Sequence, residues 1–351
     1  MKVSSRTNLL AGVVVLVAAL VASGTAAARV STHKASIQAC VLLPDTASSA
    51  RYELFDRPYL AAAFKAAGIA ATIDNAQGDA QKQRSQADGC LTNGAKVVLL
   101  DQLDPASGAS ITNAVVAAGG KVIDYDRLVV GSKASYYVSF DNVKVGVLQG
   151  KGLAAALKSK KGAVVAELNG GITDNNAKLF KQGYDSVLNP LYKSGALKKA
   201  VAGDQWTDWS ATKGLTIFEQ MLARNSNNIN GVLAANDGLA GAVVSALKNH
   251  GLKPVALTGQ DATPTGVQYI VAGWQTGTVY KSVKKEAAAA AKLAIDLIKG
   301  NTVTATAKVS GTPSVLLTPV WITKANYKLL FTDGFVKKSD VCKGTYAQFC
   351  K

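Results

Sequence analysis

Apolar runs rich in β-branched residues recur along the chain from Ser36 onward, and alanine-rich stretches with helical spacing separate them. Short runs bounded by turn residues are typical of strands in a buried sheet, whereas the longer stretches are typical of helices. We expect strands at 37–43, 70–74, 96–101, 121–125, 163–168, 198–202, 231–235 and 255–258, and helices near 176–192, 211–224 and 239–250.

This alternation predicts parallel sheets, because a helix is the usual crossover between parallel strands. A chain of 351 residues has room for two domains, and the strands fall into two groups with no Pro- or Ser-rich linker between them. We therefore predict an α/β fold with two lobes, each a parallel sheet flanked by helices, and short segments crossing between the lobes.

The first 28 residues have the pattern of an export signal. Lys2 and Arg6 precede an apolar run at 9–21, and the small residues of 25–28 provide a cleavage site after Ala28. The alternative is an uncleaved membrane anchor, since the uncharged stretch 7–28 approaches the length of a spanning helix. A lipid anchor is disfavoured because Cys40 lies well beyond the apolar run, in a predicted strand.

The four cysteines of an exported chain favour disulfides over a metal or redox site, since no pair has Cys-x-x-Cys spacing. We expect a Cys342–Cys350 bridge, and either a Cys40–Cys90 bridge or two buried free thiols. The net charge of +16 falls to +14 without Lys2 and Arg6. Lysines and arginines are scattered without interleaved aromatics, so we expect no nucleic-acid partner and attribute the charge to solvated surface near an anionic envelope.

Polar side chains gather where predicted strands end. The first half contains LLPDTASSARY, DYDR and SFDN at these places, and the second half contains NGGITDNN, GDQWTDW, AANDG and TGQDA. Ligands of open α/β sheets bind at the carboxyl ends of strands, so these segments indicate a polar ligand. A local alternative stays open for Asp174 and Asp237, because aspartates also cap helix N-termini.

These side chains suit a monosaccharide. Carboxylates accept hydrogen bonds from sugar hydroxyls, guanidinium and amide groups donate to their oxygens, and an aromatic ring can stack on the apolar sugar face. Asp126, Arg127, Asn236, Asp237 and Asp261 could supply the polar groups. The stacking faces could come from Tyr52 and from Trp206 or Trp209.

Enzyme signatures are missing from the sequence. It contains no Gly-x-Ser-x-Gly, no phosphate-binding loop and no His-Glu-x-x-His, and only two histidines, His33 and His250. The GKGLAA segment at 150–155 imitates a dinucleotide fingerprint but falls in a helical stretch. We predict that the protein is not an enzyme and has no catalytic residues, metal site or cofactor. A glycosidase with paired carboxylates is the enzyme alternative.

These segments resemble the periplasmic sugar-binding proteins of ATP-driven importers, and among them the D-xylose-binding proteins and multi-sugar receptors. The resemblance covers nearly the whole mature chain. Its matching stretches are SSARY (48–52), YDRL (125–128), YYVSFDNVKVGVLQ (136–149), DNNAKLF (174–180), GDQW (203–206), NDGLAG (236–241), TGQDA (258–262), QTGTVYK (275–281) and LLTPV (316–320). A repressor core of the same fold would need a DNA-binding helix pair where residues 1–34 hold the export signal.

The resemblance implies which side chains bind the ligand: Arg51, Tyr52, Asp126, Arg127, Asn142, Asn175 or Asn176, Trp206, Asn236, Asp237, Asp261 and Lys281. This chain departs from the family pattern at Tyr52, where tryptophan is common, at Cys40, and in its added tail SDVCKGTYAQFCK. These departures bear on the tail rather than on the site.

Family architecture implies three crossings between lobes, near Ser139, Val279 and Thr318. One lobe would combine 35–138 with 281–317, the other 139–280 with 318–340, followed by a Cys-containing tail at 341–351. The implied function is an exported, monomeric receptor in the periplasm or on the exterior of the cell envelope, which delivers a monosaccharide to a membrane importer. D-Xylose is the expected sugar, with glucose, galactose and arabinose as alternatives.

Overall fold

A computed structural model describes residues 36–350 of the chain. A seven-stranded sheet forms the first lobe, with strand order β11-β12-β5-β4-β3-β1-β2. All its neighbours pair in parallel except β11 and β12. Its strands are β1 (Ala39–Leu43), β2 (Ala71–Asn75), β3 (Val97–Leu100), β4 (Lys121–Tyr125), β5 (Tyr136–Phe140), β11 (Ala307–Val309) and β12 (Thr312–Leu317).

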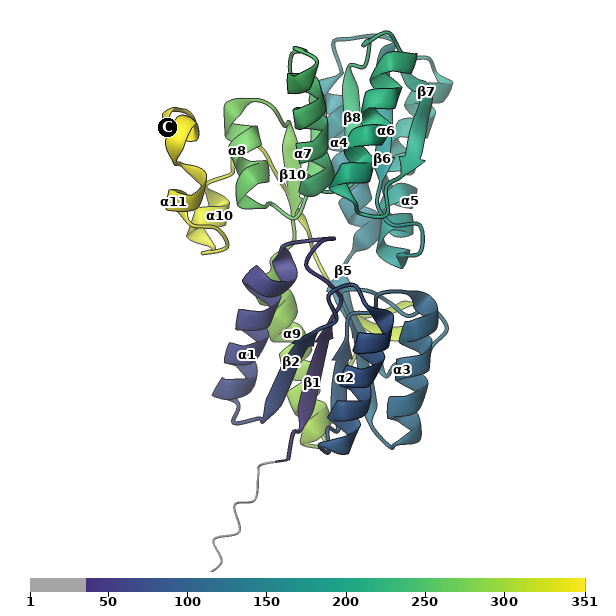
Figure 1. Ribbon diagram of the computed structural model, residues 1–351, viewed down its shortest axis with the longest axis vertical. Coiled ribbons are helices and arrows are strands. Elements are labelled where there is room, and N and C mark those ends of the chain that lie inside the picture. Colours follow the sequence, from purple (N-terminus) through teal and green to yellow (C-terminus); the bar gives the residue numbers. More distant parts are fainter. Residues whose placement is uncertain (1–35, 351) are drawn as a thin grey trace, which may run out of the picture. The chain divides into compact units, whose positions relative to one another are not determined.

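Helices cover both faces of this sheet, with α1 and α9 on one face and α2 and α3 on the other (Figure 1). They are α1 (Arg57–Ala66), α2 (Ala80–Thr92), α3 (Pro105–Ala117) and α9 (Val283–Ile298), and a π-helical turn η1 (Tyr52–Asp56) leads into α1. Because both faces are covered, strands β1 and β3 are buried along their whole length, as continuous apolar strands of a parallel sheet should be.

A six-stranded sheet forms the second lobe, in the order β13-β10-β9-β8-β6-β7, and only β13 pairs antiparallel. Its strands are β6 (Ala163–Asn169), β7 (Leu197–Trp206), β8 (Gly231–Ala234), β9 (Ala256–Gln260), β10 (Gly277–Tyr280) and β13 (Val320–Ile322). Helices α4 (Asn142–Ala156) and α5 (Asn175–Lys193) pack together, as do α6 (Ala211–Arg224) and α7 (Asp237–Asn249), with α8 (Pro264–Ala272) beside α7.

The C-terminal segment lies against α8 (Figure 1). It contains the short helices α10 (Leu329–Thr332) and α11 (Lys338–Val341) and a 3₁₀ turn η2 (Gly344–Phe349). Phe335 of this segment stacks on Phe55 of η1 with ring centroids 4.4 Å apart, so the segment also contacts the first lobe.

Two disulfides are present, Cys40–Cys90 and Cys342–Cys350. The expected tail bridge is therefore confirmed, and for the other pair the structure favours the bridge over two free thiols. Cys40 lies in β1 and Cys90 in α2, so this bridge ties a central strand to a helix that covers it.

The predicted strands and helices are all present, with one substantial difference in length. β4 has the predicted bounds, whereas β7 continues four residues past the expected 198–202 to Trp206. β7 is an edge strand, and its pairing with β6 shifts register between residues 165 and 167. Most of its later residues are polar, so the apolar pattern that predicted the strand ends before the strand itself. The GKGLAA segment lies inside α4, as predicted.

The predicted export signal, 1–28, lies outside the described residues. Within the described part of the chain, no helix has both the length and the apolar character needed to cross a membrane.

Candidate functional site

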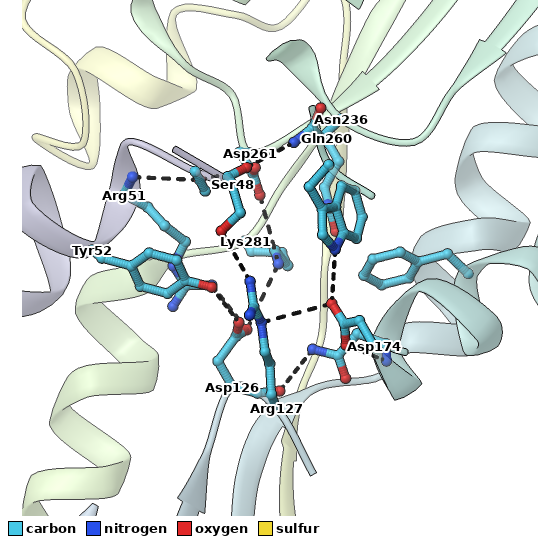
Figure 2. Close-up of a pocket in the computed structure, with 14 residues that line it drawn as sticks. Ser48, Arg51, Tyr52, Asp126, Arg127, Asp174, Asn236, Gln260, Asp261 and Lys281 are labelled. Atoms are coloured by element: carbon cyan, nitrogen blue, oxygen red, sulfur yellow. Dashed lines mark hydrogen bonds and ion pairs between the residues drawn. The ribbon is translucent and has the colours of Figure 1, made fainter. Parts of the chain in front are cut away.

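A cavity of about 310 Å³ lies where the carboxyl ends of strands from both sheets meet (Figure 2). Residues that follow β1 and β4 line it from the first lobe, and residues that follow β7, β8 and β9 or begin α5 line it from the second. The lining consists of Ser48, Ser49, Arg51, Tyr52, Asp126, Arg127, Asp174, Asn176, Phe180, Trp209, Asn236, Gln260, Asp261 and Lys281. This is the place where an open α/β sheet is expected to bind its ligand.

Arg127 is held among polar groups of both lobes. Its guanidinium donates to the Ser48 hydroxyl at 3.0 Å and to the Gln102 carbonyl oxygen at 3.3 Å. Its Nε lies 3.6 Å from Asp101 of the first lobe and 3.7 Å from Asp174 of the second. Burial raises the pKa of both carboxyls, against the opposing effect of the Arg127 charge. The planar donor fork therefore faces the cavity with its position largely fixed.

Arg51 lines the cavity, and its guanidinium binds one carboxylate of the lining and two behind it. It forms ion pairs with Asp56 at 2.7 Å, Asp126 at 3.0 Å and Glu286 at 2.6 Å. Burial raises the pKa of Glu286 to about 8, against the lowering effect of the Arg51 charge. Burial alone would also raise the pKa of Asp126, but the charges of Arg51, Lys281 and Arg127 outweigh it and hold that pKa at about 2.

The ring of Tyr52 lies within reach of two guanidinium groups. Arg51 and Arg127 lie 5.6 and 5.7 Å from its centroid, within the range of a cation–π interaction. Its hydroxyl donates to Asp126 at 3.3 Å, and the side chain is 2% exposed. The ring is therefore fixed at the wall of the cavity, with its hydroxyl held by Asp126.

Asp126 and Asp261 both have left-handed backbone conformations, with φ of 59° and 93°. Such conformations are uncommon outside glycine, and aspartate is one of the residues that adopt them most readily. Lys281 follows β10 and lies between the two carboxylates, with Nζ 3.9 Å from Asp126 and 3.6 Å from Asp261. One cation thus connects an acceptor of the first lobe to an acceptor of the second.

An aromatic corner closes the cavity on the side of the second lobe. Phe180 and Trp209 meet edge to face with centroids 6.4 Å apart, and the indole N–H of Trp209 donates to Asp174 at 3.1 Å. The indole lies over Gly170, where a Cβ atom would stand 2.2 Å from the Trp209 ring. A glycine is required there for the indole to reach the cavity.

Several hydrogen bonds connect the two lobes at the cavity. Ser49 Oγ donates to Asp261 Oδ2 at 3.3 Å, and Asn236 Nδ2 donates to the carbonyl oxygen of Ser48 at 3.3 Å. Asn176 Nδ2 donates to the carbonyl oxygen of Asp126 at 2.8 Å. These polar groups of the cavity therefore find their hydrogen-bond partners only when the two lobes are in contact.

Eight of the twelve predicted ligand residues line the cavity, and four lie elsewhere: Asn142, Asn175, Trp206 and Asp237. Asn142 begins α4 and donates to the side-chain oxygen of Asn176 at 2.8 Å, behind the lining. Asn175 begins α5 next to Asn176, which does line the cavity. Trp206 ends β7 and Trp209 takes the cavity position, so between the two tryptophans the structure favours Trp209.

Asp237 lies behind the Asp261 loop. Its carboxylate accepts from Gln275 at 2.9 Å and from the backbone N–H of Thr263 at 2.8 Å. It fits a niche in which Cβ atoms at Gly259 and Gly266 would come within 2.1 and 2.3 Å of its oxygens. Burial raises its pKa to about 7, against the lowering effect of the Gln275 hydrogen bond.

The cavity contains side chains absent from the predicted set. Ser48, Ser49 and Gln260 supply hydroxyls and an amide, and Phe180 supplies a ring. Phe180 lies one helical turn after Asn176 in α5, so the four-residue spacing could have pointed to it. Asp174, weighed as a helix cap, both accepts from the backbone N–H of Asn176 at 2.9 Å and lines the cavity.

Between residues 36 and 350, no group of His, Cys, Asp or Glu side chains is placed to hold a metal ion. The carboxylates of the cavity instead face Arg51, Arg127 and Lys281. Hydrogen bonding and aromatic packing are the chemistry that these groups offer to a ligand.

Comparison with known families decides the class of this fold. Residues 40–302 match the family model of the periplasmic binding protein domain. The chain belongs to this family. It is thus a member of a family of binding proteins rather than of enzymes, and its two-lobed α/β architecture is the one predicted from the sequence.

Alignments with similar proteins cover most of the chain. The D-xylose-binding periplasmic protein of Escherichia coli K12 is 37% identical over 82% of this chain and 87% of its own length, and its Haemophilus influenzae counterpart is 38% identical over 78% and 83%. The multiple sugar-binding periplasmic receptor ChvE of Rhizobium radiobacter is 33% identical over 85% and 90%. A carbohydrate transporter solute-binding protein of Chloroflexus aurantiacus, solved with D-glucose, superposes with a TM-score of 0.80 at 28% identity, covering 86% of this chain and 97% of that one.

Proposed function

We propose that this periplasmic binding protein captures a monosaccharide, D-xylose in preference to other aldoses, and delivers it to an ATP-driven importer. The observation that carries the proposal is the cavity between the two lobes, which presents carboxylates, a guanidinium fork, amides and an aromatic corner together. Each sugar hydroxyl both donates and accepts, and this set of side chains offers partners for both.

The cavity is narrow, with about 310 Å³ of space between its lining side chains, including the part that is open to solvent. Asp126 stays ionised over the whole physiological pH range because its pKa is about 2, so it acts as a constant acceptor for hydroxyl groups. Charge-assisted hydrogen bonds of this kind are the stronger ones in protein sites.

Closure of the two lobes would follow sugar binding. The bonds from Ser49 to Asp261 and from Asn236 to Ser48 exist only when the lobes meet, so a ligand that contacts both lobes favours the closed form. We place the hinge in the three connections between the sheets, from β5 to α4, β10 to α9 and β12 to β13. The importer would recognise the closed form from outside the cytoplasmic membrane, after export directed by residues 1–28.

Calorimetric titration of the purified protein with D-xylose, D-glucose, L-arabinose, D-galactose and D-ribose tests the proposal. Micromolar affinity corresponds to about −8 kcal/mol, and one unpaired buried hydroxyl costs roughly 1–3 kcal/mol, so a preferred sugar should bind about 5- to 150-fold more tightly than its epimers. Absence of binding to every sugar of this panel would contradict the proposal.

D-Glucose is the second candidate ligand, since two similar solved structures carry it in this fold at 28% and 26% identity. The same titration distinguishes the two sugars. For the glycosidase alternative, release of nitrophenol from nitrophenyl xylosides is the matching assay, and we expect none. A general acid must be protonated at the working pH, and the low pKa of Asp126 makes it unsuited to that role.

A further inference from the structure

A second pocket, far from the sugar cavity, opens at the opposite end of the helices of the second lobe. The last turns of α4 and α5 and the first residue of β7 border an open pocket there, with about 870 Å³ of space including its solvent-filled mouth. Its lining consists of Ala154, Leu157, Lys158, Lys160, Lys161, Leu191, Ser194, Ala196 and Leu197. Ala154 is roughly 18 Å along α4 from Asn142, whose side chain bonds to the cavity residue Asn176.

The floor of this pocket is apolar and its rim is positively charged. Leu157 and Leu197 are 6% and 4% exposed and form the floor, while Lys158, Lys160 and Lys161 are exposed at the rim. The chain segments 154–166 and 186–203 contain no Asp or Glu. Lys193 and Lys198, exposed in the second of these segments, add two more charges beside the pocket.

This lining does not suit a second sugar. Sugar sites need acceptors for hydroxyl protons and a planar stacking face, and the pocket lining contains no carboxylate, no amide and no aromatic side chain. The lining instead favours a molecule with an apolar chain and an anionic group. The chain would cover the leucines, and the anionic group would meet the lysines without competition from nearby acidic side chains.

The leucines lie at the bottom of the pocket rather than projecting from the surface. A protein that inserts into a bilayer exposes large apolar side chains beyond its polar surface, which this end of the lobe does not do with Leu157 and Leu197. The apolar part of the ligand must therefore enter the protein. A single amphiphile fits this geometry better than an intact membrane surface.

We propose that this pocket binds a single anionic amphiphile, such as a long-chain carboxylate, independently of the sugar cavity. The ligand class follows from the apolar floor and the lysine rim, and does not depend on which sugar the cleft accepts.

The test is calorimetric titration of the full chain, saturated with its sugar, with sodium dodecanoate below its micelle concentration. We expect one binding site, and at least tenfold weaker binding in the triple variant Lys158→Glu/Lys160→Glu/Lys161→Glu. The control is Lys82→Glu/Lys308→Glu/Lys324→Glu, which removes the same charge from exposed lysines elsewhere and should leave binding unchanged. If both triple variants weakened dodecanoate binding equally, the binding would depend on the overall positive charge rather than on this pocket. That result would overturn the proposal.

A second pair of variants tests the apolar floor. Ala154→Trp fills the pocket and should abolish dodecanoate binding, whereas Ala155→Trp, next to it on α4 but outside the lining, should not. Acetate, which has the charge without the chain, should not bind. Binding to anionic phosphatidylglycerol vesicles without binding to monomeric dodecanoate would indicate a membrane surface instead, and loss of sugar binding in Ala154→Trp would show that the two sites are not independent. Either result overturns the proposal.

Discussion

The guanidinium of Arg127 meets the carboxylate of Asp174 across the cavity, with Nε 3.7 Å from Oδ2. Asp101, on the same side as Arg127, lies slightly closer, at 3.6 Å, and among the described residues its two oxygens accept no hydrogen bond. One cation is therefore shared between a carboxyl group of each lobe. A ligand or substitution that moves Arg127 therefore changes the ion pairing between the lobes as well as the polarity of the site.

Replacing Arg127 with lysine should weaken sugar binding roughly 10- to 100-fold, because a charged hydrogen bond contributes about 1.5–3 kcal/mol and lysine lacks the planar fork. Calorimetric titration measures this loss. Arg84→Lys is the matched control, since Arg84 forms an exposed ion pair with Asp88 in α2 and should retain full affinity. Similar affinities in both variants would remove Arg127 from the binding site.

The two tryptophans near the end of β7 should behave differently. Trp209→Ala removes the indole that lines the cavity, and we expect at least about tenfold weaker sugar binding, or ~1.4 kcal/mol. Trp206→Ala should leave the affinity within about twofold of the parent. Quenching of tryptophan fluorescence by the sugar should disappear with Trp209 alone, and the reverse pattern would assign the stacking role to Trp206.

Substitutions at Asp237 and Asp261 should affect different properties: the first should lower the stability and the second should weaken sugar binding. Asp237→Ala leaves the buried amide of Gln275 and the backbone N–H of Thr263 without their acceptor, which should lower the free energy of unfolding by about 1–3 kcal/mol. Asp261→Asn should keep the stability and weaken sugar binding about tenfold. Denaturant unfolding and calorimetry on both variants check this, and a ligand role for Asp237 would require lost affinity at unchanged stability.

Stability should decrease as the pH rises from about 4 to 8. Burial raises the pKa of Asp124 to about 8, against one hydrogen bond from the backbone N–H of Val129, so the folded state binds a proton that the unfolded chain releases near pH 4. The proton on Asp124 stabilises the folded state fully below the pKa of the unfolded chain. This stabilisation is lost as the pH rises to the pKa of the folded state, and the free energy of unfolding falls by up to about 1.4 kcal/mol per pH unit. Asp124→Asn should remove this group's part of the slope of unfolding free energy against pH, whereas Asp237 and Glu286 keep theirs. Asp88→Asn, an exposed control, should keep the slope of the parent.

The two disulfides should differ in their contribution. Cys40 and Cys90 close a loop of 50 residues and Cys342 and Cys350 a loop of 8, so chain-entropy arguments give about 4 and about 2.5 kcal/mol. Replacing each cysteine pair with alanine and comparing the urea midpoints of unfolding measures how much each disulfide stabilises the protein. A larger loss from the tail pair would indicate that the tail stabilises the fold by more than loop closure.

The fold was predictable because its inner strands are apolar along their length and alternate with helices, as in β1 and β3. The convergence of polar strand ends on one cavity was also predictable, since parallel strands end at the same edge of a sheet. Individual positions within a turn were harder to predict. Asp208 and Trp209 have left-handed backbone conformations, with φ of 54° and 61°, and these turn the indole of Trp209 back over Gly170.

The roles of buried polar residues could not be read from their order along the chain. Asp237 and Asn142 have the residue types of ligand groups, yet their neighbours in space place them one layer behind the cavity. Glu286 belongs to α9, 235 residues after Arg51, and only the fold brings the two together at 2.6 Å. Such pairs depend on tertiary packing and have no local pattern.

The late crossing from β12 to β13 has a consequence for folding during synthesis. β12 lies between β11 and β5 in the first sheet, and β13 forms an edge of the second, so neither sheet is complete before residues 312–322 have been made. A truncation at residue 311 should therefore damage both lobes rather than release one intact lobe. Until its last tenth is synthesised, the nascent chain lacks a strand of each lobe and stays short of its final packing.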